Sequence, residues 1–196
     1  MDALILAGGE NKRLPVIKGF IDVDGKRIIE SNIELLEKIF NRVIISTNTP
    51  ELYFYLGVVM VGDIVEDKGP MTGILSALTM PDVSEVFVTA CDMPFIKPAL
   101  VKYIVDSWDR GPDAVIPIFE KKPQPLLGIY SKKLADHMER SIKNEERGLT
   151  RFLDKVNVRY IDEQQVRRID PEGRSFVNIN TIEDYQTEIG GKPCLV

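Results

Sequence analysis

Histidine and cysteine are scarce in this sequence. Among 196 residues there is one histidine, His137, and there are two cysteines, Cys91 and Cys194. Cys91 sits in an apolar run and Cys194 near the C-terminus, which argues against a disulfide framework and a cysteine-based metal site. His137 lies in a polar helical pattern that predicts an exposed side chain. Any chemistry should therefore depend on carboxylates, cations and a metal.

The sequence also lacks an excess of positive charge and any long apolar run. Lys and Arg number 25 against 30 Asp and Glu, so the net charge is −5, which argues against nucleic acid as the main partner. No run approaches the length of a membrane span, and the N-terminus has no signal-peptide pattern. We predict a cytoplasmic protein that binds neither nucleic acid nor membrane. With no linker, repeat or low-complexity segment, residues 1–196 are expected to form a single domain.

Apolar runs alternate with helical patterns along the chain. The predicted strands are 3–6, 43–47, 58–61, 85–89, 114–118 and 126–129. The predicted helices are 28–40, 71–78, 98–108 and 132–143. Continuous apolar runs are typical of strands covered on both faces, as in a mostly parallel sheet between helices. Beyond residue 145 the pattern predicts only a late strand, 175–178, and a late helix, 181–187.

The first predicted strand runs into Ala7-Gly8-Gly9. No side chain there keeps a ligand from the backbone, and glycine tolerates the positive φ that lets successive N–H groups converge on an anion. Arg13 and Lys18 follow, so one loop would bring backbone donors and two cations to a polyphosphate. The G-x-G-x-x-G and G-x-x-x-x-G-K-[ST] patterns are both absent, and a plain strand-to-loop turn is the alternative.

Polar residues follow the next three predicted strands as well: Asn48, Asp67 and Asp92. In a parallel sheet all of these would open onto the edge where ligands bind. Asp92 is suited to hold Mg²⁺ against phosphates, because Mg²⁺ takes one or two protein carboxylates plus phosphate oxygens and water. The alternative is that Asp92 caps the helix that starts near Pro98. Asp67 is suited to accept hydrogen bonds from the N–H and NH₂ donors of guanine.

Two further segments offer polar groups to a ligand. Residues 69–73 (Gly-Pro-Met-Thr-Gly) open an apolar helix with free N–H groups, although a plain loop-to-helix junction fits equally well. Asn178 and Asn180 would point to the same side of the late strand and present two amides to a substrate. Thr181 followed by Asp184 predicts a capping box for the last helix.

Taken in order from residue 4 to about residue 187, these motifs resemble those of the molybdenum cofactor guanylyltransferase family (molybdopterin-guanine dinucleotide biosynthesis protein A). The matching motifs are Leu6-Ala7-Gly8-Gly9, Arg13, Lys18-Gly19, Gly69-Pro70-Met71-Thr72-Gly73, Cys91-Asp92-Met93-Pro94 and Val177-Asn178-Ile179-Asn180-Thr181. The resemblance implies an α/β, Rossmann-like three-layer nucleotidyltransferase fold (glycosyltransferase A-like) with a mostly parallel sheet. It also implies transfer of GMP from GTP to the phosphate of Mo-molybdopterin, with Mg²⁺ as cofactor and pyrophosphate released.

The resemblance further implies a role for each matched position. The nucleotide-binding residues would be Leu6, Ala7, Gly8, Gly9, Lys18, Asp67 and Asp92, with Asp67 beside guanine. The catalytic residues would be Arg13, Lys18 and Asp92, with Asp92 also the Mg²⁺ ligand, and Asn178 and Asn180 would face molybdopterin. Cofactor-accepting or chaperone proteins would be further partners.

The chemistry suits a chain with a single histidine. The attacking phosphate is already ionised at neutral pH, so no general base is required, and the enzyme has to supply alignment and charge neutralisation. Two alternatives stay open at this point. One is another nucleotidyltransferase of the same fold, which adds CMP to molybdopterin or NMP to a sugar or isoprenoid phosphate. The other is a non-catalytic nucleotide-binding module.

Overall fold

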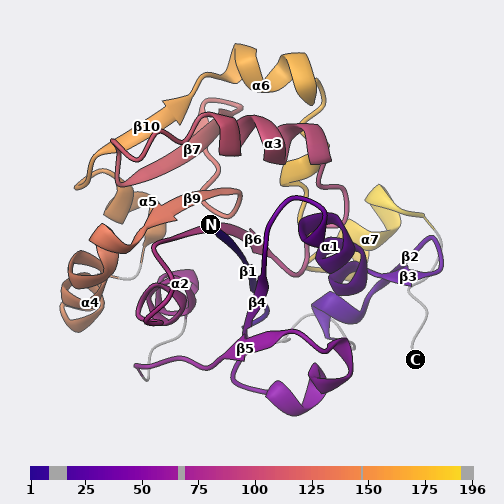
Figure 1. The fold of residues 1–196 in the computed structure, drawn as a ribbon. Helices are drawn as coiled ribbons and strands as arrows, with labels where there is room; N and C mark the ends of the chain where they lie inside the picture. The colour runs from indigo at the N-terminus through magenta and orange to yellow at the C-terminus, as the bar shows by residue number, and fades with distance from the viewer. Residues whose placement is uncertain (9–16, 66–68, 147, 191–196) are drawn as a thin grey trace.

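An eight-stranded sheet runs through the centre of the molecule in the computed structural model, which describes residues 1–8, 17–65, 69–146 and 148–190 (Figure 1). The strand order is β10-β7-β9-β6-β1-β4-β5, and β8 pairs with β7. The strands of this sheet are β1 (Asp2–Leu6), β4 (Val43–Ser46), β5 (Val59–Val61), β6 (Glu85–Ala90), β7 (Ala114–Phe119), β8 (Lys122–Pro123), β9 (Gly128–Ser131) and β10 (Val158–Ile161). A separate hairpin is formed by β2 (Asp22–Val23) and β3 (Lys26–Arg27).

Most neighbouring strands run parallel. β1 is parallel to both β4 and β6, β4 to β5, and β7 to β10. β9 is the exception in the interior of the sheet, antiparallel to both β6 and β7. The carboxyl ends of β1, β4, β5 and β6 therefore meet at one edge, as the sequence predicts, and the mostly parallel sheet is confirmed.

Helices cover both faces of the sheet and make three layers (Figure 1). One layer contains α1 (Ile28–Glu37), α3 (Pro98–Asp106) and α6 (Glu163–Ile169), and the other α2 (Pro70–Leu78), α4 (Ala135–Lys143) and α5 (Leu149–Leu153). Side chains alternate along β1, so Ala3 and Ile5 pack with the first layer and Leu4 and Leu6 with the second. The three-layer α/β fold is confirmed.

The last helix, α7 (Ile182–Glu188), packs beside the β2–β3 hairpin and the start of α1. Its Tyr185 shares a small apolar cluster with Ile21, Ile28 and Ile179. The predicted capping box is confirmed: the Thr181 hydroxyl accepts from the Asp184 N–H, and the Asp184 carboxylate accepts from the Thr181 N–H.

The late strand predicted at residues 175–178 is wrong. Arg174–Phe176 form a 3-10 turn, and residues 177–180 belong to no strand. This segment pairs with the loop after β6 through a single backbone bond, from Ile179 N–H to the Asp92 carbonyl (2.9 Å), so no ladder forms. Asn178 and Asn180 consequently do not share one side of a strand. The predicted helix 132–143 is also split, into a 3-10 turn at Lys132–Leu134 and α4.

Other expectations concern single residues and the molecule's surroundings. His137 is exposed on α4, and Cys91 is buried with a free thiol, whereas Cys194 lies outside the described residues. None of the helices in the described ranges has both the length and the apolar character needed to cross a bilayer. The single-domain assignment stays a prediction.

Candidate active site

The glycine loop leaves the sheet between the ends of β4 and β6. The Leu6 carbonyl accepts from the Cys91 N–H (3.0 Å), and the Ala7 N–H donates to the Ser46 carbonyl (2.9 Å). Gly8 follows and is exposed, with open space among the described residues where a side chain would point. Gly9 and Arg13 lie outside the described residues. The loop therefore starts at the edge where a doubly wound sheet binds its ligand.

Lys18 lies at the centre of a cluster of polar side chains at this edge of the sheet. Its Nζ lies 3.2 Å from Asp92 Oδ2 and also donates to Asn180 Oδ1. Three of the predicted site residues, far apart in the sequence, are thus brought together. Each comes from a different part of the fold: the turn before the β2–β3 hairpin, the loop after β6, and the segment before α7.

Gly19 explains how Lys18 reaches Asp92. This glycine is buried, and a Cβ placed on it would lie 3.3 Å from Cys91 Cβ and 3.4 Å from Ile29 Cβ. Because glycine has no side chain, the 3-10 turn Lys18–Phe20 can pack closely against Cys91, the residue that follows β6. The Cys91 thiol lies behind this contact, and burial raises its pKa to about 12, so it stays protonated at neutral pH.

Asp92 does not cap α3. The N-cap of that helix is Lys97, and it makes no side-chain cap bond, so the capping alternative is wrong. Asp92 is 8% exposed, and its Oδ1 is buried without a hydrogen-bond partner among the described residues. Burial raises the pKa of this carboxyl, and the Lys18 ammonium only partly offsets that effect. Asp92 is therefore a desolvated carboxyl group, one oxygen of which meets no donor within the described ranges.

That free oxygen fits the predicted magnesium site. Mg²⁺ commonly binds through one or two protein carboxylates and takes its other ligands from phosphates and water. In the described part of the chain, no three His, Cys, Asp or Glu side chains gather in one place, so Asp92 would be the main protein ligand there. The buried, unpartnered Oδ1 is the observation that supports this assignment.

The two asparagines face different surroundings. Asn180 contacts Lys18, whereas the Oδ1 of Asn178 is buried and has no hydrogen-bond partner in the described ranges. Asn178 lines a pocket of about 110 Å³. The other residues that line it are Met93, Gln124, Pro125, Leu126, Leu127 and Phe176. The pocket thus offers apolar walls and the amide groups of Gln124 and Asn178, and one of its walls is Met93, the residue that follows Asp92.

The predicted loop at residues 69–73 opens α2, with Gly69 as N-cap and Pro70 in the first turn. Gly73 lets α2 approach the sheet closely, because a Cβ there would lie 2.5 Å from Ser46 Oγ and 2.8 Å from Leu6 Cδ2. The N-terminus of α2 consequently lies near the ends of β1 and β4. Asp67 lies outside the described residues, so its role beside guanine stays a prediction.

Asn48 and Asn32 serve the scaffold of the site. Asn48 is exposed and exchanges hydrogen bonds with Asp63, to the carboxylate (2.6 Å) and from the backbone N–H (2.9 Å), which joins the segments after β4 and β5. Asn32 is 2% exposed on α1 and donates to the Met93 carbonyl (3.2 Å), beside Asp92. Asn32 was not predicted as part of the site, although an amide on the apolar face of a predicted helix is a detectable signal.

Comparison with known proteins decides the family. A model of the MobA-like NTP transferase domain matches residues 3–163. The chain belongs to the MobA-like NTP transferase family. Its relatives include a probable molybdenum cofactor guanylyltransferase from Peptoclostridium acidaminophilum, 34% identical over 94% of this chain and 86% of that protein. The molybdenum cofactor guanylyltransferase of Syntrophotalea carbinolica is 35% identical over 94% of this chain and 88% of its own length.

One solved structure agrees with this family membership, and a more distant one shares the fold. Molybdopterin-guanine dinucleotide biosynthesis protein A from Archaeoglobus fulgidus superposes with a TM-score of 0.83 and 29% identity, over 96% of this chain and 97% of the other. The 4-diphosphocytidyl-2C-methyl-D-erythritol synthase of Anaerococcus prevotii has a TM-score of 0.66 and only 17% identity, over 93% and 91% of the two chains, and shares the fold alone.

Proposed function

We propose that this nucleotidyltransferase transfers GMP from GTP to the phosphate of Mo-molybdopterin. The observation that carries the proposal is the meeting of Lys18, Asp92 and Asn180 at the sheet edge where the glycine loop departs. The family and the names of its relatives supply the substrates: GTP as donor and molybdopterin as acceptor. The location in the cytoplasm and the accepting or chaperone proteins stay predictions.

The reaction is a substitution at the α-phosphorus of GTP. A phosphate oxygen of the acceptor forms a new P–O bond, the bond to the β-phosphate oxygen breaks, and pyrophosphate leaves with the electron pair. Because the attacking oxygen is already ionised, no side chain has to remove a proton. Catalysis then depends on alignment and on neutralising the charge of the phosphates.

Each described residue has a part in that alignment. Lys18 exchanges its contacts with Asp92 and Asn180 for oxygens of the triphosphate, and the backbone around Ala7 and Gly8 lies against the nucleotide. Asp92 would hold Mg²⁺ through its free Oδ1, and the metal would neutralise charge on the phosphates. Asn178 and its pocket lie on the acceptor side, where apolar walls and amide groups suit a flat heterocycle with hydrogen-bonding edges.

The test is a transfer assay with radiolabelled GTP, Mg²⁺ and Mo-molybdopterin. We expect pyrophosphate and the guanine dinucleotide in equal amounts, and neither product when the acceptor or the metal is left out. Tight GTP binding without turnover would instead support a non-catalytic module. Equal or better use of CTP would support a cytidylyltransferase, so a direct comparison of GTP with CTP is the most informative control.

A further inference from the structure

An ion pair between Lys97 and the buried Asp170 joins the loop that carries Asp92 to the C-terminal segment. Lys97, at the end of that loop, places its Nζ 2.8 Å from Asp170 Oδ1. Its backbone N–H also donates to Ser175 Oγ (3.0 Å), and the Ser175 N–H donates to Asp170 Oδ2 (2.8 Å). Asp170 and Ser175 are both completely buried. We refer to Lys97, Asp170 and Ser175 as the Asp170 cluster.

The same two segments meet again at the other end of the loop. There the Ile179 N–H donates to the Asp92 carbonyl (2.9 Å). The loop is therefore joined to the C-terminal segment at its second residue, Asp92, and at its last, Lys97, and Asn178 and Asn180 lie on either side of Ile179 at the first of these junctions. The double attachment thus joins the loop that carries Asp92 to the segment that carries both asparagines.

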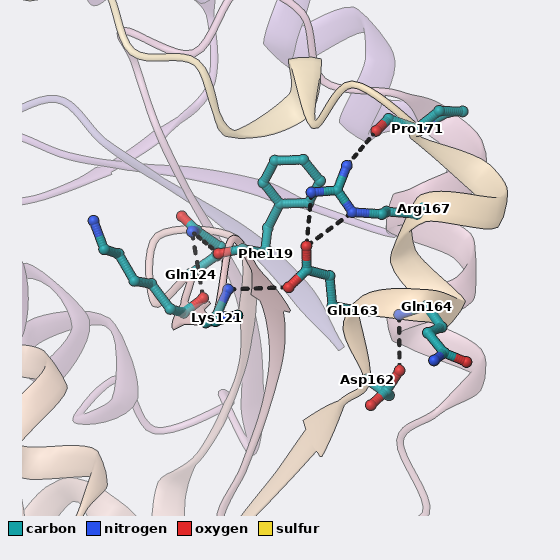
Figure 2. Close-up of polar contacts among 9 residues, drawn as sticks. Phe119, Lys121, Gln124, Asp162, Glu163, Gln164, Arg167 and Pro171 are labelled. Atoms are coloured by element: carbon teal, nitrogen blue, oxygen red, sulfur yellow. Dashed lines mark hydrogen bonds and ion pairs between the residues drawn. The ribbon is translucent and has the colours of Figure 1, made fainter.

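The C-terminal segment is itself anchored through α6, as Figure 2 shows. The Glu163 carboxylate accepts from the Lys121 N–H (3.0 Å) and from Arg167 Nε (2.8 Å). The Arg167 guanidinium lies 4.3 Å from the centre of the Phe119 ring and donates to the Pro171 carbonyl (2.8 Å). The turn that contains Asp170 is thus held against the end of β7.

Stability alone gives little reason for a charge at this position. Lys97 is 39% exposed, so water screens its pairing with Asp170, and a screened ion pair contributes little to the free energy of unfolding. The Asp170 carboxylate instead joins two segments: it pairs with the Lys97 ammonium and accepts from the Ser175 N–H, and so fixes the register between them.

We infer that Asp170 is a positioning residue for the transfer reaction, which with Lys97 and Ser175 holds Asn178 and Asn180 at a fixed distance from Asp92. This inference rests on the proposed function, since it assigns Asp92 to the nucleotide side and the asparagines to the acceptor side. A substitution reaction at phosphorus needs its attacking oxygen in line, and a misplacement of about 1 Å can cost about 100-fold in rate. Asp170 itself touches no reacting atom.

The experiment uses the full chain with Asp170→Asn and Lys97→Met, and Asp109→Asn as matched control. Asp109 pairs with Arg159 on the exposed surface (3.1 Å), so its loss also removes one ion pair. At a temperature where all variants are folded, we expect kcat to fall about 30- to 100-fold in the two cluster variants. The Kd of GTP should change by less than about twofold. Asp109→Asn should have the kcat and the GTP Kd of the wild-type chain. Lys97→Arg retains the positive charge, so its kcat should lie much closer to the wild-type value than that of Lys97→Met.

Hydrogen exchange gives a readout that needs no turnover. Exchange of the Ile179 amide should accelerate in Asp170→Asn and stay unchanged in Asp109→Asn, while the amides of β6 stay protected in both. A folded Asp170→Asn protein with full kcat and an unchanged Ile179 amide would overturn the inference. So would a parallel loss of kcat and GTP affinity that simply follows the loss of folded protein.

The inference also has to be testable if Asp170→Asn does not fold, or if the wild-type chain transfers no GMP. If Asp170→Asn does not fold, Ser175→Ala removes a single neutral bond, and its kcat should fall with Ile179 exchange accelerated; unchanged values of both would overturn the inference. If the wild-type chain transfers no GMP, the proposed function fails. The Asp170 cluster is then judged by Ile179 exchange alone, with acceleration in support of it and no change against it.

Discussion

The two parts of the active site are built in different ways. The nucleotide side rests on the parallel strands β1, β4 and β6, whose backbone ladders fix the starts of the loops that follow them. The acceptor side rests on a segment without a strand, held by side-chain contacts. Besides the Asp170 cluster, Arg174 pairs with Glu188 and lies 3.9 Å from the centre of the Phe95 ring.

This difference has a consequence for mutational sensitivity. A backbone ladder survives most substitutions of side chains, so the nucleotide side should lose function only when a residue that touches the nucleotide changes. The acceptor side depends on individual charges and rings, so residues remote from the substrate should matter there as well. The following predictions test the contrast, beginning with the largest effect.

Asp92→Asn should abolish most turnover and leave the fold intact. The amide keeps the volume of the side chain but removes the charge that a cation requires, so kcat should fall at least about 100-fold. Since burial raises the pKa of Asp92, its charge is costly in the folded chain, and the thermal midpoint without ligand should not fall. Steady-state kinetics and thermal denaturation check both points. Normal turnover at ordinary Mg²⁺, or a variant that does not fold, would contradict the assignment.

Lys18→Ala should weaken GTP binding much more than GMP binding. Loss of a charge-assisted hydrogen bond costs about 1.5–3 kcal/mol, so the Kd of GTP should rise about tenfold or more. Titration calorimetry with both nucleotides measures the difference. Lys143→Ala is the control, because Lys143 pairs with Glu139 on the exposed surface of α4. Equal losses for GTP and GMP would count against a polyphosphate contact.

Gly173→Ala should destabilise the acceptor side. Gly173 has φ +66°, and a Cβ there would lie 2.2 Å from the Phe119 ring. Overpacking of this kind costs about 1–3 kcal/mol of unfolding free energy, which denaturant titration measures. Gly8→Ala, on the nucleotide side, meets open space among the described residues and should change stability by less than about 0.5 kcal/mol. A loss in Gly173→Ala as small as that in Gly8→Ala would contradict the tight contact with Phe119.

Asp170→Asn should lower stability only above acidic pH. Burial alone would raise the pKa of Asp170, but the hydrogen bonds from Lys97 and Ser175 outweigh it, and the pKa lies below the ordinary 3.8. Because the folded-state pKa is depressed, the ionised carboxylate stabilises the fold above about pH 4, and this contribution disappears as pH falls through the folded-state value.

The expected size of the Asp170 contribution is small. Lys97 is 39% exposed, so water screens the pair, and the wild-type chain should exceed Asp170→Asn by only about 1 kcal/mol at neutral pH. Denaturant titrations from pH 7 to pH 3 measure the gap between the two proteins. A gap that is constant over this range would show that the charge of Asp170 contributes nothing.

The sequence predicts the nucleotide side of the fold better than the acceptor side, for a physical reason. Strands such as β6 are buried on both faces and read as continuous apolar runs. β10 was missed because it is an edge strand with Arg159 and Tyr160 exposed, and α6 was missed because only Val166 is buried. Neither element carries the apolar signal that local pattern analysis detects.

The same limit applies to the site. Asp92 follows a buried strand and Lys18 follows the glycine loop. The position of a residue after a strand or a glycine loop can be recognised from the sequence alone. In the sequence, Asp170 and Lys97 look like ordinary surface charges. A polar contact between residues far apart in the chain produces no periodic pattern of apolar residues, so local pattern analysis does not detect it. The false strand at residues 175–178 has a related origin: alternating apolar and polar residues there pack against a loop instead of another strand.

The central place of β1 has a consequence for biosynthesis. Of the strands in this sheet β1 is made before the others, yet it lies between β4 and β6, so the middle of the sheet cannot close before Glu85–Ala90 has been synthesised. Closing that long loop costs chain entropy before any pairing compensates for it. After β6 has paired with β1, its other edge stays unpaired until the antiparallel β9 has been synthesised. In the folded protein all six residues of β6 are buried. During that interval the nascent chain presents an apolar strand edge, which is when it is most exposed to aggregation and most dependent on chaperones.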